Sequence, residues 1–224
     1  MNLALFDLDH TLIDGDSDVE WPKFLIQRGL LEGEQYTHQR DYFYQRYCDG
    51  TLDMNAFLDF QLQPLSRFSR EELDRFHIDY MDTHIRPIIS QAARDLVIAH
   101  AAQGDTLMMI TATNRFISGP IAAEFGIAHL IAVELEEDEA GRFTGKPTGI
   151  LSFREGKVQR LQQWLKARDE TFSSYEKVFF YSDSHNDIPL LSIVSHPIVV
   201  DPDPTLQAHA MEYDWPIMSL RHGT

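Results

Sequence analysis

The chain of 224 residues is long enough for one large domain, or for a core domain that carries a smaller insertion. Its formal net charge of −16 argues against a nucleic-acid partner, because binding to the phosphate backbone depends on Lys and Arg. The same charge is compatible with a small phosphate ester, whose own charge a bound metal can neutralise. Cys48 is the single cysteine, so an internal disulfide is excluded.

Neither end of the chain resembles a targeting or membrane segment. The first residues have no basic stretch, and Asp7 interrupts their apolar run, so we expect no signal peptide. The apolar stretch 188–200 is too short for a membrane span and contains Pro189 and Pro197. We therefore expect a soluble cytoplasmic protein without a membrane partner.

Short apolar runs alternate with helical patterns along most of the chain. Continuous apolar runs predict buried parallel strands, and they occupy residues 3–6, 106–110, 178–181 and 197–200. Apolar residues at helical spacing predict helices over residues 88–103, 116–125, 156–168 and 204–213. Residues 130–136 and 142–144 flank a turn-like EDEAG and predict a hairpin. The alternation predicts an α/β fold with a Rossmann-like, doubly wound parallel sheet.

One long segment breaks this alternation after the first strand. Residues 18–85 are rich in aromatic and charged residues, and their apolar residues recur at helical spacing, which predicts three or four inserted helices. We expect a core of residues 1–16 and 86–224 and a helical cap of residues 17–85. Most aromatic residues of the cap should lie in its core. One or two of a set of four are expected to line a pocket, namely Trp21, Tyr36, Phe43 and Tyr44.

Two carboxylates, Asp7 and Asp9, directly follow the first predicted strand. Ligands of open parallel sheets bind at the carboxyl ends of the strands. Two acids that share a pocket raise each other's pKa unless a cation lies between them, and Mg²⁺ prefers such oxygen ligands. Taken alone, the pattern is more typical of a helix cap at Asp7 followed by a solvated acid at Asp9.

Other strand ends carry matching chemistry. Asp183 and Asp187 follow the strand 178–181, the hydroxyls of TATN follow the strand 106–110, and Lys157 opens a helix after Gly156. Since the ends of parallel strands meet at one edge of the sheet, these groups should converge. A carboxylate nucleophile, an acid, phosphate donors and a counter-charge are what metal-assisted phosphoryl transfer requires.

Four motifs in order resemble those of the haloacid dehalogenase superfamily phosphatases, in the phosphoserine-phosphatase-like branch. FDLDHTL is similar to the first motif, ITAT to the second, EGKV to the third and SDSHNDIPLL to the fourth. The resemblance covers the whole chain and includes the insertion after the first motif. Within the branch, the stretches GDSD, TATNRF, FREGKV and YSDSHNDIPLL are most similar to bacterial histidinol-phosphatases.

The resemblance implies the catalytic roles. Asp7 is the expected nucleophile that forms an aspartyl-phosphate, and Asp9 the general acid and base. Lys157, rather than Lys146, is the expected catalytic lysine, because Lys146 should lie in a surface loop. Thr11 is expected to fix the turn between the two acids and the next helix.

The expected Mg²⁺ site uses Asp7, Asp9 through its carbonyl, Asp183 and Asp187. For Asp187 three roles remain open. It orients a metal-bound water, it orients a positive group beside the ion, or it is an acid that favours a helix N-terminus.

The expected phosphate and substrate contacts are less specific. Thr111 offers a hydroxyl and Ala112 an amide, while Thr113 and Asn114 extend this cradle or cap the next helix. Asn186 is a further candidate, and Asp16 or Ser17 meets a substrate amine or forms a solvated helix cap. Two residues inside the motifs, His10 and His185, are interpreted as incidental.

These expectations together predict Mg²⁺-dependent hydrolysis of a small phosphorylated metabolite that bears an amino group. Histidinol phosphate is the first expected substrate and phosphoserine the second. A phosphomutase that uses the same intermediate is one alternative. A non-catalytic receiver-like module is another, although such a module needs neither a cap nor Asp9.

Overall fold

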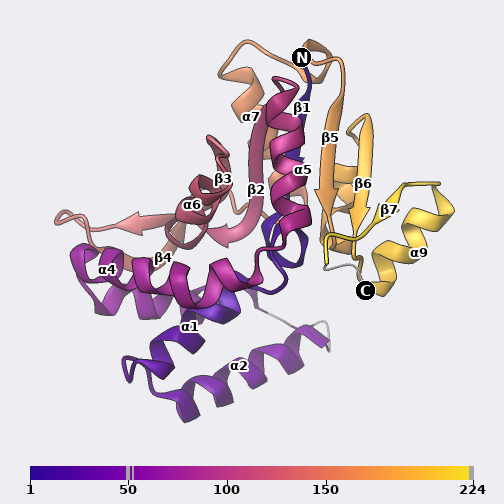
Figure 1. The fold of residues 1–224 in the computed structure, drawn as a ribbon. Coiled ribbons are helices and arrows are strands. Elements are labelled where there is room, and N and C mark those ends of the chain that lie inside the picture. Colours follow the sequence, from indigo (N-terminus) through magenta and orange to yellow (C-terminus); the bar gives the residue numbers. More distant parts are fainter. Residues whose placement is uncertain (49–50, 52, 222–224) are drawn as a thin grey trace.

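The computed structural model describes residues 1–48, 51 and 53–221. A seven-stranded sheet in the order β4-β3-β2-β1-β5-β6-β7 forms its centre (Figure 1). All neighbouring strands pair in parallel except β3 and β4, which form the predicted antiparallel hairpin. The predicted α/β fold is therefore confirmed. The strands are β1 (Leu3–Phe6), β2 (Thr106–Asn114), β3 (His129–Glu137), β4 (Phe143–Thr148), β5 (Val178–Ser182), β6 (His196–Val200) and β7 (Ile217–Met218).

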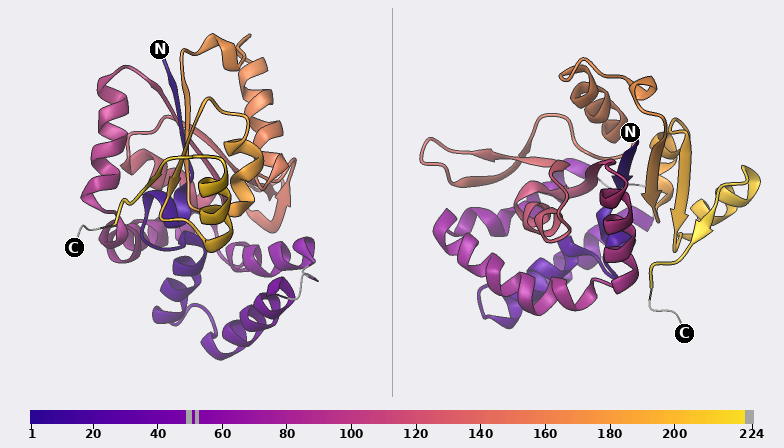
Figure 2. Two further views of the ribbon diagram at one scale, coloured as in Figure 1. Left: turned by 90° about the vertical axis from the view of Figure 1, so that its right-hand side faces the viewer. Right: turned by 45° about the horizontal axis from the view of Figure 1, so that its top comes forward.

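Helices cover both faces of this sheet (Figure 2). The α-helices are α1 (Ser17–Gln27), α2 (Gly33–Cys48), α3 (Met54–Leu62), α4 (Arg70–Tyr80), α5 (Gln91–Ala102), α6 (Arg115–Glu124), α7 (Glu155–Lys166), α8 (Ile188–Leu191) and α9 (Pro204–Glu212). Short helical turns are η1 (Leu8–Leu12), η2 (Gln63–Arg67), η3 (Met81–Ile85), η4 (Arg86–Ile88), η5 (Phe172–Ser174) and η6 (His185–Asp187). No described helix is long and apolar enough to cross a membrane.

The central strand β1 explains why its sequence is continuously apolar. Ala4 and Phe6 join a hydrophobic cluster with residues of α5 and α6, whereas Leu3 and Leu5 join a second cluster with residues of α7, α8 and α9. Successive side chains of a strand point to opposite faces, so a strand covered on both faces has no position for a polar residue. The first polar residue, Asp7, therefore marks the end of the strand.

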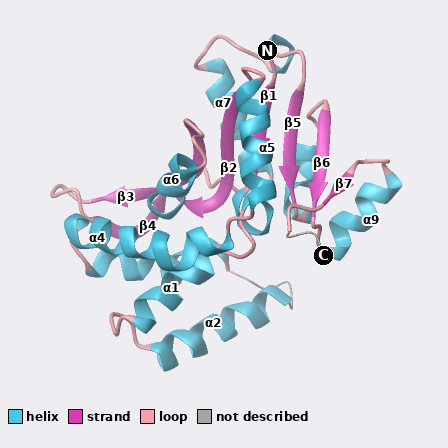
Figure 3. Cartoon of the chain, viewed as in Figure 1, coloured by secondary structure: helices cyan, strands magenta, loops and turns pink. Residues whose placement is uncertain are grey.

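The predicted insertion is helical, and it lies beyond the carboxyl ends of the parallel strands (Figure 3). Trp21 and Phe24 of α1 pack against Tyr80 of α4, while Tyr36 and Phe43 of α2 stack on Phe60 of α3. Helices α1 to α4 and the helical turns η1 to η4 lie between β1 and α5 in the chain. The division into a core and a cap at residues 17–85 stays a prediction.

Three local expectations need correction. The strand expected at 106–110 runs on to Asn114, because β2 regains its pairing with β3 at Asn114 and Val133 after a shift in register. Lys146 lies exposed on β4 rather than in a loop. The two-residue strand β7 was not predicted, because two residues carry no periodic signal.

Candidate active site

A cavity of about 280 Å³ lies at the carboxyl ends of β1, β2 and β5, and α3 contributes one of its walls. All but two of the predicted site residues line it. They are Asp7, Asp9, Asp16, Thr111, Ala112, Thr113, Lys157, Asp183, Asn186 and Asp187. The convergence follows from the parallel sheet, since these segments are far apart in sequence but leave it at one edge.

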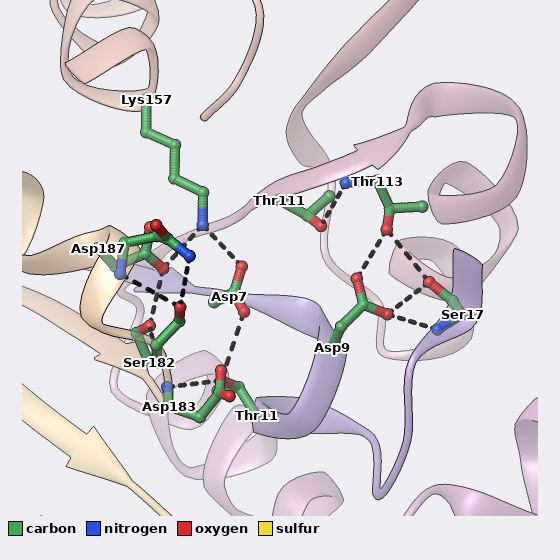
Figure 4. A network of polar contacts seen from close by, with 12 residues as sticks. Asp7, Asp9, Thr11, Ser17, Thr111, Thr113, Lys157, Ser182, Asp183 and Asp187 are labelled. Carbon is green, nitrogen blue, oxygen red and sulfur yellow. Dashed lines mark hydrogen bonds and ion pairs between the residues drawn. The ribbon is translucent and has the colours of Figure 1, made fainter. Parts of the chain in front are cut away.

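Lys157 is the buried centre of the first group of contacts (Figure 4). Its Nζ atom lies 2.8 Å from Asp7 Oδ1 and 2.8 Å from Asp187 Oδ2. The Ser182 hydroxyl also donates to Asp187 Oδ2, at 2.7 Å. We call these four residues the Lys157 cluster. It joins the end of β1, the end of β5 and the start of α7.

Gly156 places Lys157 close enough to make these contacts. A Cβ atom at residue 156 would lie 1.9 Å from the carbonyl oxygen of Leu151, far inside van der Waals contact. Only glycine fits such a close approach of two backbone segments. The glycine before the lysine therefore has a packing reason, beyond the helix start noted in the sequence.

Thr11 connects two acids from different strands. Its Oγ1 donates to Asp183 Oδ1 at 3.0 Å, accepts from the Asp183 amide at 3.1 Å and lies 3.5 Å from Asp7 Oδ2. Instead of the expected bonds to nearby backbone, Thr11 makes contacts that connect η1 to the loop after β5. The carboxylates of Asp7 and Asp183 lie on either side of one hydroxyl.

Asp9 belongs to a second group of contacts. Its Oδ1 accepts from the Ser17 amide at 2.6 Å and from the Ser17 hydroxyl at 2.5 Å, and its Oδ2 accepts from the Thr113 hydroxyl at 2.7 Å. Thr113 Oγ1 also lies 3.1 Å from Asp18 Oδ2. We call Asp9, Ser17, Asp18 and Thr113 the Asp9 cluster. The left-handed backbone of His10, with φ of 54°, turns the chain between the strand end and α1.

Burial and crowding shift the pKa values of the acids. Burial raises the pKa of Asp7 well above its usual value; Lys157 lowers it, and Asp187, Asp183 and Asp9 raise it further. Burial likewise raises the pKa values of Asp183 and Asp16 to about 7. Burial lowers the pKa of Lys157, but Asp187 and Asp7 more than offset this, so its pKa is raised overall. Lys157 alone does not balance the negative charge of the cavity.

The donor set fits a hard divalent cation. Asp7 and Asp183 supply carboxylate oxygens near one another, and crowded carboxylates are relieved by an ion with oxygen ligands. Within residues 1–48, 51 and 53–221, no three acidic, His or Cys side chains already form a metal-binding group. The side chains of Asp9 and Asp187 are engaged by hydroxyls and by Lys157, so a metal site would need backbone oxygens as well.

Two predicted residues lie behind the cavity wall. Ser17 is fully buried and holds Asp9, and Asn114 is buried and caps α6, where its Oδ1 accepts from the Ile117 amide at 3.1 Å. Asp16 caps α1 through the Val19 amide but still lines the cavity. For Asn114 the expected capping role is the one that the structure shows.

Several lining residues were not expected from the sequence. His10 was interpreted as incidental, and Asp18, Phe57, Leu58 and Gln61 were not singled out, yet all of them line the cavity. The four aromatic residues expected to supply one or two lining residues do not line this cavity. One of them, Trp21, is only 2% exposed and packs in the core. Asp18 belongs to the acid-rich stretch 14–18 at the start of the insertion, whereas nothing in the sequence marks the face of α3 that meets the cavity.

A larger cavity of about 630 Å³ lies between α4, α6 and the β3–β4 hairpin. Its arginines are already paired with acids. The pairs are Arg70 with Glu137, Arg115 with Glu134, and Arg86 with Asp82 and Glu124. It contains none of the predicted site residues, so the smaller cavity is the better candidate for chemistry.

Comparison with known proteins places this site in a family. Residues 4–192 match the model of the haloacid dehalogenase-like hydrolases. A histidinol-phosphatase from Neisseria meningitidis serogroup C is 47% identical over 98% of this chain and 99% of its own length. A probable phosphatase from Mycobacterium tuberculosis is 27% identical over 97% of this chain and 75% of its own.

Solved structures share the fold of this chain. A protein of unknown function from Bordetella pertussis Tohama I is 41% identical, with a TM-score of 0.92 and 98% of both chains covered. A phosphoserine phosphatase solved as a phospho-aspartyl intermediate analogue has a TM-score of 0.66 over 98% of this chain and 93% of its own. At 17% identity, this second likeness concerns the fold alone.

Proposed function

Because the chain belongs to the haloacid dehalogenase-like hydrolase family and is a phosphoric monoester hydrolase, we propose that it acts through an aspartyl-phosphate on Asp7. The proposed reaction is Mg²⁺-dependent hydrolysis of a small amino-bearing phosphate ester. Histidinol phosphate is the first substrate, by similarity to the Neisseria enzyme, and phosphoserine the second. The observation that carries the proposal is the buried contact between Asp7 and Lys157 in a cavity that Asp9 also lines.

In the first half-reaction the Asp7 carboxylate attacks phosphorus, and the bond between phosphorus and the alcohol oxygen breaks. Lys157 holds Asp7 Oδ1 in place, and its charge offsets the negative charge that develops on the phosphoryl oxygens. Asp187 and Ser182 in turn hold the ammonium of Lys157. Of the roles open to Asp187, these contacts favour the orientation of a positive group.

Asp9 completes both proton transfers in this scheme. It protonates the leaving alcohol and then takes a proton from the water that hydrolyses the aspartyl-phosphate. Ser17 and Thr113 fix its side chain, so the acid stays directed at the cavity. Thr111 and Ala112 line the same wall and are proposed to donate to the phosphoryl oxygens.

Asp7 and Asp183, with the Asp9 carbonyl, are the proposed holders of Mg²⁺. When bound, the ion supplies charge neutralisation for the phosphate and keeps Asp7 ionised despite the burial that raises its pKa. Asn186 lines the cavity beside this site, where Arg154 donates to its Oδ1 at 2.9 Å. Asp16 lines the cavity on the side of the insertion, and the acids of this segment are the proposed region of contact for a substrate amine.

Trapping of the intermediate tests the proposal. Wild-type protein is mixed with Mg²⁺ and histidinol phosphate, quenched and reduced with borohydride, and the peptide that contains Asp7 is analysed by mass spectrometry. We expect conversion of Asp7 to homoserine and steady release of inorganic phosphate without an isomeric ester. Release of phosphate without modification of Asp7 would contradict the intermediate, and formation of an isomer would favour a phosphomutase.

A further inference from the structure

The charge inventory of the active-site cavity limits what the substrate can carry. Among the described residues that line it, Lys157 is the only lysine or arginine. Both short contacts of its ammonium go to carboxylates, Asp7 and Asp187, at the phosphate end. His10 also lines the cavity but is exposed. The remaining charged lining residues are acids.

Two arginines near the cavity, Arg154 and Arg40, do not line it and contact other side chains. Arg154 donates to Asn186 and lies over the ring of Phe153, and its own side chain does not line the cavity. Arg40 on α2 pairs with Asp41 on the outside of the insertion. A carboxylate on the leaving group would therefore enter a cavity whose described lining has many acids and, besides Lys157, no lysine or arginine. A buried charge without a partner is strongly unfavourable.

Asp18 lies close to Asp9, the proposed acid for the leaving alcohol. Asp9 and Asp18 both approach the hydroxyl of Thr113, at 2.7 and 3.1 Å, so Asp18 is one side chain away from the acid that protonates the leaving alcohol. The Asn114 amide, 3.4 Å from Asp18 Oδ1, helps to fix the carboxylate from behind. Burial, together with Asp16 and Asp9, raises the pKa of Asp18 well above its usual value, and a cation placed beside it favours its charged form.

The wall beside Asp18 is apolar. Phe57 and Leu58 of α3 line it, together with Leu151 and Phe153 from the segment between β4 and α7. Such a wall matches an uncharged carbon chain or a flat ring, and it offers no donor to a carboxylate. Among the described residues of α3 that line the cavity, Gln61 is the only polar one, and it bears no charge.

We propose, on the basis of the proposed function, that the leaving group is an amino alcohol without a carboxylate and that Asp18 recognises its ammonium group. An ammonium beside Asp18 offsets the crowding of Asp9, Asp16 and Asp18, whereas the carboxylate of an amino acid adds to it. Of the two candidate substrates, this selects histidinol phosphate, which has an amine and a ring, over phosphoserine.

A matched pair of esters tests the exclusion of the carboxylate. O-phosphoethanolamine and O-phosphoserine differ only by this group, and p-nitrophenyl phosphate measures the chemistry without either. We expect kcat/KM for phosphoethanolamine to exceed that for phosphoserine by about tenfold or more, since an unpaired charge in a closed site is rejected strongly. Equal values, or a preference for phosphoserine, would overturn the inference.

The role of Asp18 is tested with a second matched pair, histidinol phosphate and its analogue that lacks the amine, 3-(imidazol-4-yl)propyl phosphate. In the wild type we expect the amino ester to be preferred. In Asp18→Asn, or in Asp18→Ser if the first variant does not fold, the ratio of the two kcat/KM values should fall about tenfold or more. The ratio within one variant cancels a general loss of activity.

Asp14→Asn is the matched control, because Asp14 undergoes the same chemical change but is exposed, pairs with Arg221 and does not line the cavity. Its ratio should equal that of the wild type. An unchanged ratio in Asp18→Asn would refute the role of Asp18. Failure of the wild type to hydrolyse any ester, p-nitrophenyl phosphate included, would instead refute the proposed function.

Discussion

The two acids of the first motif lie two residues apart, but they belong to differently built parts of the cavity. The Lys157 cluster, which holds Asp7, is formed by charged groups at the ends of β1 and β5 and at the start of α7. The Asp9 cluster is formed by hydroxyl and amide donors from β2 and from the first turn of α1. The Lys157 cluster connects strand ends to α7, whereas the Asp9 cluster connects the sheet to the insertion (Figure 4).

This difference suits the two proposed roles. A nucleophile must stay ionised in a buried place, and a fixed ammonium favours its charged form. The proposed general acid Asp9 is instead held by the neutral amide and hydroxyl donors of Ser17 and Thr113. Because Ser17 begins α1, the position of Asp9 is also coupled to the segment that contacts the leaving group.

The largest expected effect comes from removal of the nucleophile. Asp7→Asn should lower kcat about 10³-fold or more on every ester, because a neutral amide neither attacks phosphorus nor binds a cation well. Steady-state kinetics on histidinol phosphate and p-nitrophenyl phosphate measure the loss. An Asp7→Asn protein with near-normal turnover would eliminate the mechanism.

Removal of the acid should separate the substrates. Asp9→Asn is expected to lower kcat about 10²–10⁴-fold on alkyl phosphates, the usual contribution of general acid catalysis. The loss on p-nitrophenyl phosphate should be clearly smaller, because its leaving group departs without protonation. Equal losses on both esters would assign Asp9 to another role.

The two lysines near the hairpin give the next comparison. Lys157→Ala should lower kcat about 10²-fold on all esters, and it should lower the free energy of unfolding by about 3–5 kcal/mol, since Asp7 and Asp187 would stay buried without a cation. Lys146→Ala, at an exposed position of β4, should change the free energy of unfolding by no more than about 0.5 kcal/mol. Its effect on the activation free energy for kcat should be equally small. Steady-state kinetics, carried out below the unfolding midpoint of each variant, measure kcat. Thermal unfolding measures the free energy of unfolding. The reverse order would place the third motif on the wrong lysine.

A pair of single hydroxyl deletions gives the smallest and most selective test. Ser17→Ala removes a donor to Asp9, and Ser182→Ala removes a donor to Asp187. Each hydrogen bond to a charged group contributes about 1.5–3 kcal/mol, so kcat should fall about tenfold or more in each variant. Ser17→Ala should affect alkyl phosphates more than p-nitrophenyl phosphate, while Ser182→Ala should affect them equally. The same selectivity in both variants would mean that the two clusters do not act separately.

The strands of the core and the polar residues just beyond them could be predicted from the sequence. A buried parallel strand must be apolar on both faces whatever its neighbours are, so β1 and β5 are visible as continuous runs. Polar residues just beyond such runs meet because parallel strands end at one edge. That rule predicted that Asp7 and Asp183 meet at one edge, and Gly156 pointed to Lys157, which lines the same cavity.

Only the tertiary structure decided which neighbours of these residues face the cavity. Asn114 and Thr113 are adjacent in sequence, yet the register shift in β2 leaves one as a helix cap and the other as a partner of Asp9. Trp21 and Phe57 are both aromatic residues of the insertion, and the sequence does not distinguish their environments. Packing buries Trp21, whereas Phe57 lines the cavity. Periodicity identifies the apolar face of a helix, but it does not identify what that face packs against.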